Sequence, residues 1–294
     1  MIFKLKSIKN KLLRRFLEHG IYFALVLILV PGLYFDLWIV LPSFLEKSSY
    51  AYFGHLCLTS FIIFNFVGNM YCGLFTSSTI PAENLEGFNK DEWDFCSACE
   101  CLRPPRAWHC DVCEICVLHR DHHCRFLAGC VGYYNRRYFI ILNLYTFIGM
   151  AGFLFYIIVY VSPFIRWNYG LILIKMCCPP LALIFDFGVE SLCVLLVVSN
   201  VVVANLLGYG LYYHFNNILK GRLVPEIKRN SKDFIHNKGW KLNLIEVFGS
   251  RWYLTWISPF IHSELPGNGI ELLVKNKICW ATHTYILNLI LKFF

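Results

Sequence analysis

Charged residues are scarce in this chain of 294 residues: Asp, Glu, Lys and Arg make up 16% of it, while hydrophobic residues make up 57%. A soluble domain usually carries about a quarter charged residues. The deficit argues against an ordinary soluble domain and indicates that lipid is part of the solvent. The first long apolar run also lacks a small-residue cleavage site and is too long for a signal peptide, so we expect it to remain as an anchor.

Four stretches are apolar and long enough to form membrane helices, which need about 20 residues each. They cover residues 20–41, 50–75, 138–165 and 191–213. Pro31 in the first stretch is tolerable, because neighbouring helices can satisfy the carbonyl group that it frees. A shorter run at 171–185 contains two prolines and a lysine, and is predicted to be a loop against the membrane. The sequence therefore predicts an all-α polytopic membrane protein with four transmembrane helices.

The distribution of lysine and arginine predicts the orientation. The arm at residues 1–19 holds six of them, the segment 76–137 holds seven and the tail 214–294 holds eleven, so that only three of the 27 lie elsewhere. Cytosolic loops carry such an excess. We therefore expect both termini and segment 76–137 in the cytosol, helices 1 and 2 within 20–75, and helices 3 and 4 with a lumenal loop within 138–213. The net charge of +8 is then a topology signal, and nucleic-acid binding is not expected.

Cysteines gather in the central segment, where eight of the 14 lie between Cys96 and Cys130. Disulfides are rare on the reducing side of a membrane, so these thiols are expected to bind metal or to react. Three Cys-x-x-Cys steps with interleaved histidines predict tetrahedral zinc sites. Spacing alone leaves open how Cys110, Cys113 and Cys116 are divided between the sites. A metal-free thiol loop is the alternative, but this segment has modest apolar content, and zinc would supply folding energy.

The order of motifs in this segment is specific. It contains Cys96-x2-Cys99, Arg103-Pro104-x-Arg106, His109-Cys110, a cysteine run to Cys116, Asp121-His122-His123-Cys124, Cys130, Gly132, Asn135 and Phe139. In order and spacing it resembles the cysteine-rich domain of the DHHC palmitoyltransferases, as does its place between the second and third spans. The resemblance implies a protein S-acyltransferase that moves a palmitoyl group from acyl-CoA to cysteine thiols of membrane-associated proteins.

The same resemblance implies how the ligands divide and which residue reacts. One structural Zn²⁺ would take Cys96, Cys99, His109 and Cys116, and a second would take Cys110, Cys113, His123 and Cys130. Both sites are closed, as structural zinc sites are. Cys124 is then a spare thiol that carries the acyl chain, with His122 as its base and Asp121 orienting that histidine. The alternative makes Cys124 another zinc ligand.

The approach to the third span suggests where the reaction takes place. Arg136 and Arg137 lead into this span shortly after Cys124, which places the thiol at the cytosolic membrane face. Arg125, Arg136 and Arg137 are candidates to bind the phosphates of palmitoyl-CoA, and equally to face lipid headgroups. Phe126 is expected near the nucleophile or the acyl chain. The expected partners are the bilayer, palmitoyl-CoA and cytosolic-face substrates with juxtamembrane cysteines, and the expected membranes are the Golgi or endoplasmic reticulum.

Two departures from the family pattern bear on activity. Phe126 replaces a tryptophan after the tetrad, and the segment 221–226 lacks the expected threonine pair while keeping its glycine and glutamate. If those threonines support Asp121, this chain must support it in another way. Asn243 matches a structural asparagine of the family's C-terminal element, and His119 is predicted to be a solvated loop histidine. A membrane zinc-binding scaffold and an inactive DHHC pseudoenzyme are the non-enzymatic alternatives.

Overall fold

The computed structural model describes residues 34, 36–80, 93–164, 177, 188–229 and 236–270. The contacts within the chain divide it into two units. The helical unit consists of Met1–Tyr71 and Phe139–His214, and the cysteine-rich unit consists of Cys72–Tyr138 and Phe215–Phe294. Each unit is therefore assembled from two stretches that are far apart in the sequence.

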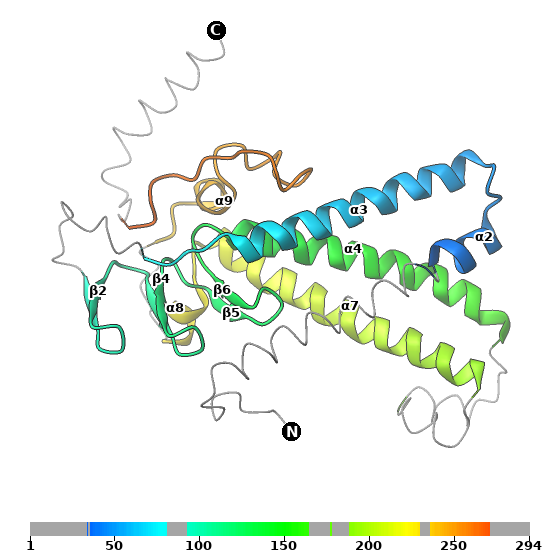
Figure 1. The fold of residues 1–294 in the computed structure, drawn as a ribbon, viewed down its shortest axis with the longest axis horizontal. Helices are drawn as coiled ribbons and strands as arrows, with labels where there is room; N and C mark the ends of the chain where they lie inside the picture. Colours follow the sequence, from blue (N-terminus) through cyan, green and yellow to red (C-terminus); the bar gives the residue numbers. More distant parts are fainter. Residues whose placement is uncertain are drawn as a thin grey trace, which may run out of the picture. The chain divides into compact units, whose positions relative to one another are not determined.

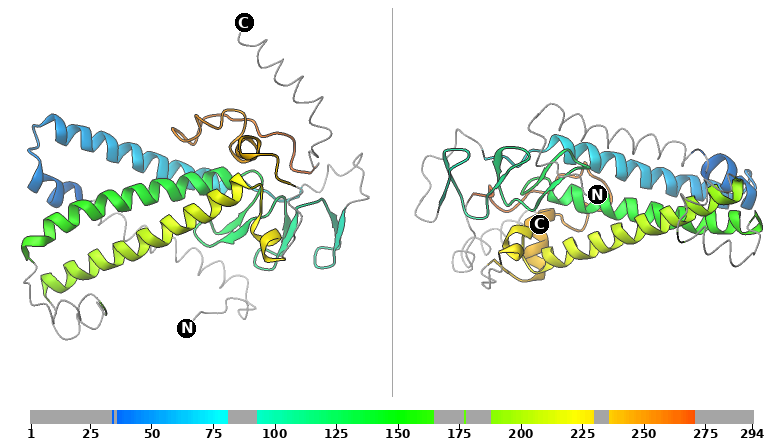
Figure 2. Two further views of the ribbon diagram at one scale, coloured as in Figure 1. Left: turned by 180° about the vertical axis from the view of Figure 1, so that it is seen from behind. Right: turned by 90° about the horizontal axis from the view of Figure 1, so that it is seen from below.

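Three long helices dominate the helical unit: α3 (Tyr50–Phe75), α4 (Arg136–Val161) and α7 (Val189–Leu219). Their ribbons run alongside one another in all three views (Figures 1 and 2). At about 1.5 Å per residue, the 26 residues of α3 or of α4 exceed the roughly 30 Å apolar core of a bilayer. Within the described part of the chain, these three helices are long and apolar enough to cross a membrane.

The helix boundaries differ in part from the predicted spans. The second predicted span coincides with α3, whereas α4 begins at Arg136 and gives way to the 3-10 turn η3 (Ser162–Phe164), which contains Pro163. Helix α7 continues to Leu219, because no glycine or proline interrupts residues 214–219. Residues 20–33 and 35 of the first predicted span, and most of the predicted loop at 171–185, lie outside the described residues. The described end of the first span forms the π-helical turn η2 (Asp36–Val40) followed by α2 (Leu41–Phe44).

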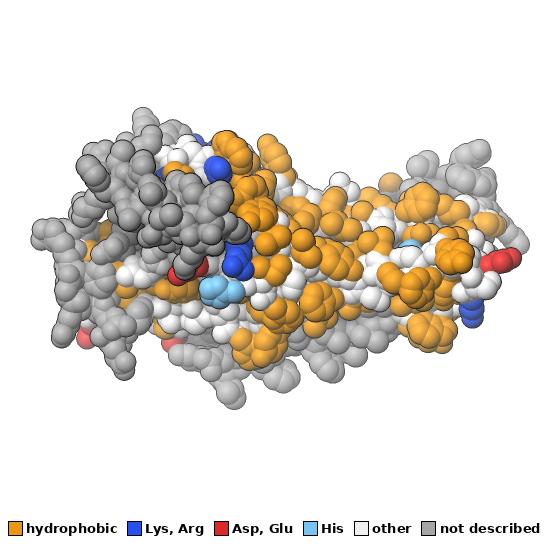
Figure 3. Space-filling model, turned by 90° about the horizontal axis from the view of Figure 1, so that it is seen from above, with side chains coloured by type: hydrophobic (Ala, Val, Ile, Leu, Met, Phe, Trp, Pro, Cys, Tyr) orange, Lys and Arg blue, Asp and Glu red, His pale blue; other side chains and the backbone are white. Residues whose placement is uncertain are grey.

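The surface of the helical unit suits a lipid environment. Large apolar side chains stand exposed along the helices, among them Phe53, Phe155 and Leu206, each 66% exposed. Figure 3 shows hydrophobic side chains covering much of the face in view. Between the helices, the Tyr156 hydroxyl lies 3.2 Å from His55 Nδ1. Such pairing is expected where no water can satisfy polar groups.

The cysteine-rich unit contains three short antiparallel hairpins of three-residue strands. They are β1 (Asp94–Cys96) with β2 (Cys101–Arg103), β3 (Trp108–Cys110) with β4 (Ile115–Val117), and β5 (His122–Cys124) with β6 (Gly129–Val131). Two-stranded ribbons of this length are not stable by themselves in water. The hairpins therefore need other contacts, and the unit provides them through side chains and potential metal ligands.

Asn135 joins the end of α3 to the third hairpin and to the residue that follows it. Its Oδ1 accepts the backbone N–H of Gly132 at 2.8 Å, and its Nδ2 donates to the carbonyls of Cys130 at 3.0 Å and Gly73 at 3.4 Å. These bonds tie the last turn of α3 to β6 and to the start of α4. The third hairpin is thereby fixed next to the two helix ends that enter the unit.

The C-terminal part of the unit adds two short helices, α8 (Val224–Lys228) and α9 (Trp240–Phe248). Glu226 caps α8 by accepting the backbone N–H of Leu223 at 2.8 Å. Phe248 at the end of α9 is fully buried and packs on the ring of Trp256, with 4.6 Å between ring centroids. The segment after α9 therefore folds back over the helix (Figure 1).

Candidate active site and metal centres

The three hairpins share one local design. In each of them the first strand ends on a cysteine, a four-residue turn follows, and the last turn residue has a positive φ. The cysteines are Cys96, Cys110 and Cys124, and the positive-φ residues are Glu100, Glu114 and Ala128. Such a turn aims backbone N–H groups at the cysteine sulfur, and the N–H of Cys113 donates to Cys110 Sγ at 3.4 Å.

Two sets of four potential ligands form between neighbouring hairpins. Each set combines two cysteines from one turn with a histidine and a cysteine that are cross-strand partners in the next hairpin. The sets are Cys96, Cys99, His109 and Cys116, and Cys110, Cys113, His123 and Cys130, and within each set the ligand atoms lie within 4.8 Å of one another. These are the same two sets that the family resemblance implies.

The separations of the ligand atoms fit a tetrahedral ion. A zinc ion with bonds of about 2.3 Å to sulfur and about 2.0–2.1 Å to nitrogen separates its ligands by roughly 3.5–3.8 Å. Nδ1 of His109 lies 3.2 Å from Cys99 Sγ, and the Sγ atoms of Cys113 and Cys130 are 3.7 Å apart. Sulfur and imidazole donors in this number are those that zinc prefers, so the residues present fit the metal.

The thiols in the second set compete for protons. A hydrogen bond with Cys113 lowers the pKa of Cys110, and the same bond raises the pKa of Cys113. Burial lowers the pKa of His123, but hydrogen bonds to Cys110 and Cys130 outweigh it and raise this pKa to about 10. A divalent cation would relieve this competition, because it takes the place of the shared protons.

Cys124 lies outside both sets, although it ends its strand as the potential ligands Cys96 and Cys110 do. The third residue of its turn is Leu127, where the other two turns have a second cysteine ligand. Cys124 is 5% exposed. Burial raises the pKa of its thiol, and hydrogen bonds from the backbone N–H groups of Leu127 and Phe126 act in the opposite direction. A thiol whose pKa is raised in this way needs a base to form the reactive thiolate.

The alternation of strand β5 separates the two histidines of the tetrad. Successive side chains of a strand point to opposite faces, so His122 and Cys124 share one face and His123 points to the other. His123 is the cross-strand partner of Cys130, with which it belongs to the second ligand set. The strand geometry thus places His123 in the second ligand set and His122 on the same face as Cys124.

Asp121 precedes this strand and is 1% exposed. Its Oδ2 lies 3.0 Å from His122 Nδ1, which is the contact that orients an imidazole for acid–base work. Its Oδ1 lies 3.2 Å from Arg136 Nη2 and accepts the backbone N–H of Val224 at 3.3 Å. The segment that lacks the threonine pair therefore still reaches Asp121, through a backbone donor. The sequence offered no local signal for the partnership with Arg136.

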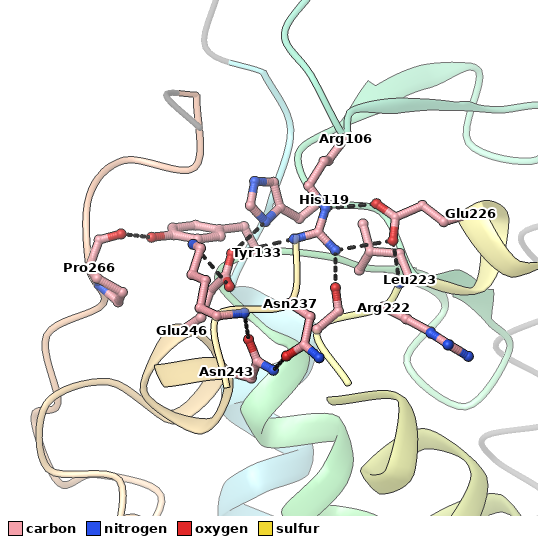
Figure 4. Close-up of polar contacts among 12 residues, drawn as sticks. Arg106, His119, Tyr133, Arg222, Leu223, Glu226, Asn237, Asn243, Glu246 and Pro266 are labelled. Carbon is pink, nitrogen blue, oxygen red and sulfur yellow. Dashed lines mark hydrogen bonds and ion pairs between the residues drawn. The ribbon is translucent and has the colours of Figure 1, made fainter. Parts of the chain in front are cut away.

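A buried polar network connects the cysteine-rich segment with the C-terminal part of the unit (Figure 4). Arg106 donates to Glu226 Oε1 at 2.7 Å and to the carbonyl of Gly221 at 2.8 Å. Glu246 lies 3.5 Å from Arg106 Nη1 and 3.6 Å from His119 Nδ1. The retained glutamate of segment 221–226 is therefore an ion-pair partner of an arginine in the Arg-Pro-x-Arg motif.

His119 corrects one prediction, because it is buried in this network and not solvated. Its ring meets the ring of Tyr133 edge-on, with 5.0 Å between centroids. Burial and the nearby charge of Arg106 hold the pKa of His119 well below its usual range, so the ring is neutral at physiological pH. The sequence around His119 contains no signal that the distant helix α9 covers it.

Asn243 is also buried, in α9. Its Nδ2 donates to the carbonyl of Leu219 at 2.8 Å and to Asn237 Oδ1 at 2.9 Å, and its Oδ1 accepts the backbone N–H of Lys238 at 3.1 Å. One side chain thereby links the end of α7, the loop before α9 and α9 itself.

The four candidate acyl-CoA contacts occupy different environments. Arg125 and Phe126 are exposed in the turn after Cys124. Arg137 is half-buried, donates to the carbonyl of Ser263 at 3.3 Å and lies over the ring of Tyr138. Arg136 is buried against Asp121. The exposed turn next to Cys124 is thus the part of the candidate surface that is open to a ligand.

Helices able to cross a membrane, together with two metal-capable clusters and a buried thiol outside both of them, define a multi-pass membrane protein with a cysteine-rich domain. A profile of the family described as DHHC palmitoyltransferase matches residues 89–231. The chain is 34% identical over 265 residues to the probable palmitoyltransferase ZDHHC24 of Rattus norvegicus, which covers 87% of each chain. It is 33% identical over 260 residues, 85% of each chain, to the protein of that name from Homo sapiens.

A more distant relative is palmitoyltransferase ZDHHC15A of Danio rerio, 27% identical over 186 residues, which are 60% of this chain and 51% of that protein. The match to the first two relatives extends well beyond the cysteine-rich segment, since it covers most of both chains. The chain belongs to the DHHC palmitoyltransferase family.

Proposed function

We propose that this protein is a protein S-acyltransferase that moves a palmitoyl group from palmitoyl-CoA, through an acyl-Cys124 intermediate, to cysteine thiols of membrane-associated proteins. One observation carries the proposal: Cys124 ends its strand as two ligand cysteines do, yet it lies outside both ligand sets and on the strand face of His122. Membership of the family, whose members include proteins named palmitoyltransferases, supports the same reaction.

The proposed reaction exchanges one thioester for another in two steps. In the first step, His122 takes the proton of Cys124, whose sulfur attacks the thioester carbonyl of acyl-CoA. The bond from the carbonyl carbon to the CoA sulfur breaks, and CoA leaves with the proton from His122. In the second step, the substrate thiol gives its proton to His122 and attacks the acyl-Cys124 carbonyl, and Cys124 leaves and regains that proton. Asp121 holds the imidazole in orientation and stabilises its charged form.

Two Zn²⁺ ions are the proposed cofactors, held by the two ligand sets described above. When bound, structural zinc supplies folding energy and ties the turn of one hairpin to the strands of the next. Each set has four protein ligands, so no position remains for a reacting group. His123 and Cys130 belong to such a set and flank Cys124, which gives the nucleophile a rigid support.

The proposed topology has four spans, the first within residues 20–41, with both termini and residues 76–137 in the cytosol. The excess of lysine and arginine in these segments supports it. The fatty chain of palmitoyl-CoA would then enter the bilayer side, where each buried CH₂ contributes about 0.8 kcal/mol. Arg125 and Arg137 are better placed than the buried Arg136 to meet CoA phosphates, and Phe126 is placed to contact the acyl chain. The proposed membrane is that of the Golgi or endoplasmic reticulum.

The decisive experiment compares the purified protein with a Cys124→Ser variant after incubation with a clickable palmitoyl-CoA analogue. We expect hydroxylamine-sensitive label on the wild type and none on Cys124→Ser, with two zinc ions per chain in both. Cys101→Ser is a matched control, because Cys101 is a half-buried thiol outside both ligand sets. Absence of label on the wild type with zinc retained would favour the inactive or scaffold alternatives.

A further inference from the structure

We propose that Arg136 is the positioning residue of the active site: it holds one oxygen of Asp121 so that the other oxygen stays on His122. This role differs from the contact with CoA phosphates or lipid headgroups that the sequence suggests for Arg136. The inference rests on the proposed function, because it assigns Asp121 and His122 to the reaction of Cys124. Its basis is an arrangement of buried charges within the cysteine-rich unit.

One nitrogen of the buried Arg136 guanidinium, Nη2, makes two contacts. The Arg136 side chain is 8% exposed, and Nη2 lies 3.2 Å from Asp121 Oδ1. The same nitrogen donates to the backbone carbonyl of Arg222 at 3.0 Å. The backbone N–H of Arg136 donates to the carbonyl of Gly132 at 3.0 Å, in the turn that opens α4. A planar group held in this way offers donors in a fixed direction.

Asp121 needs such a partner, because a buried carboxylate is costly unless it is paired and hydrogen-bonded. Its Oδ1 receives Arg136 and the backbone N–H of Val224, while its Oδ2 faces His122. The two oxygens thus have different partners, and rotation of the carboxylate would break the contacts of both. The Val224 bond, at 3.3 Å, comes from a neutral donor, whereas Arg136 brings a positive charge to this end of Asp121.

The two roles for Arg136 predict different kinetics of acyl-enzyme formation. A residue that binds CoA phosphates changes the half-saturating concentration of palmitoyl-CoA when it is removed. A residue that positions Asp121 changes the maximal rate instead, because it acts on the transition state through His122. Moreover, it loses its effect once the carboxylate of Asp121 is gone, since it acts through that group.

The test measures single-turnover formation of hydroxylamine-sensitive acyl-enzyme in detergent over a range of palmitoyl-CoA concentrations. We expect Arg136→Met to lower the maximal rate by at least about tenfold, a part of the 10²–10⁴-fold range of acid–base catalysis, with an unchanged half-saturating concentration. Arg136→Lys should recover part of the rate. In an Asp121→Asn background, adding Arg136→Met should change the rate less than twofold. Arg251→Met, the same change at an exposed arginine, serves as the control.

Zinc content and elution volume show whether each variant is folded. If Arg136→Met alone loses its fold, the comparison of Asp121→Asn with the double variant decides, because the double variant leaves no buried carboxylate without its partner. A raised half-saturating concentration at an unchanged maximal rate would overturn the inference, as would an equal loss in both backgrounds. Failure of the wild type to form any acyl-enzyme would instead refute the proposed function, so the two failures are distinguishable.

Discussion

The ion pair between Arg106 and Glu226 offers the sharpest test of what holds the cysteine-rich unit together. The Arg106 side chain is 4% exposed and that of Glu226 is 16% exposed. Replacing Arg106 by Met retains the aliphatic part of the side chain but removes the guanidinium. That group pairs with Glu226 and lies 3.5 Å from Glu246. The replacement also removes the donor to the carbonyl of Gly221. Two nearly buried carboxylates then lose one positive charge.

The magnitude follows from this burial. Removing one partner of a buried ion pair costs about 3–5 kcal/mol, because the remaining charge stays desolvated. With a shift of about 2–4 °C per kcal/mol for a protein of this size range, the unfolding midpoint should fall on the order of 10 °C. A double variant that also carries Glu226→Gln should lose much less than the sum of the single losses, since the uncompensated charge is gone and the amide oxygen can still cap α8.

The assay is thermal unfolding in detergent, followed by the reaction of newly exposed cysteines with a fluorogenic thiol reagent. Arg103→Met is the matched control: its partner Asp94 has a 74% exposed side chain, so this pair should contribute at most about 1 kcal/mol. Equal midpoints for Arg106→Met and Arg103→Met would refute the reasoning. Additive losses in the double variant would show that the two side chains act independently.

Three further outcomes can be checked on the same protein. Gly132→Ala should destabilise by about 1–3 kcal/mol in the same thermal assay, because a Cβ there would lie 2.6 Å from the carbonyl oxygen of Leu118. His109→Ala should lower the zinc content, measured by elemental analysis, from two ions per chain towards one; two retained ions would contradict the ligand set. Tyr133→Phe should cost about 1 kcal/mol and speed proteolysis after α9, because its hydroxyl donates to the carbonyl of Pro266 at 2.7 Å; unchanged cleavage would contradict this anchor.

Local patterns in the sequence were sufficient for the elements that depend on near neighbours. The apolar run at 50–75 gave the bounds of α3, because a membrane helix satisfies its own backbone and needs only length and apolarity. The spacing of the cysteines indicated metal sites, since a Cys-x-x-Cys turn brings two thiols together within a few residues. The family resemblance divided Cys110, Cys113 and Cys116 between the two sets, a division that spacing alone left open and that the structure also shows.

Contacts between distant segments required the tertiary structure. Arg106 and Glu226 are 120 positions apart, and Asp121 and Val224 are 103 apart, so no local pattern pairs them. The absence of the threonine pair predicted that Asp121 is supported in another way, but not that Val224 supports it, because a backbone N–H group is present at every residue but proline and leaves no mark in the sequence. The sequence predicted that His119 is solvated, but α9 packs over it and buries it. The sequence determined which groups were present near Cys124, and the packing of segments far apart in the chain decided which of them met.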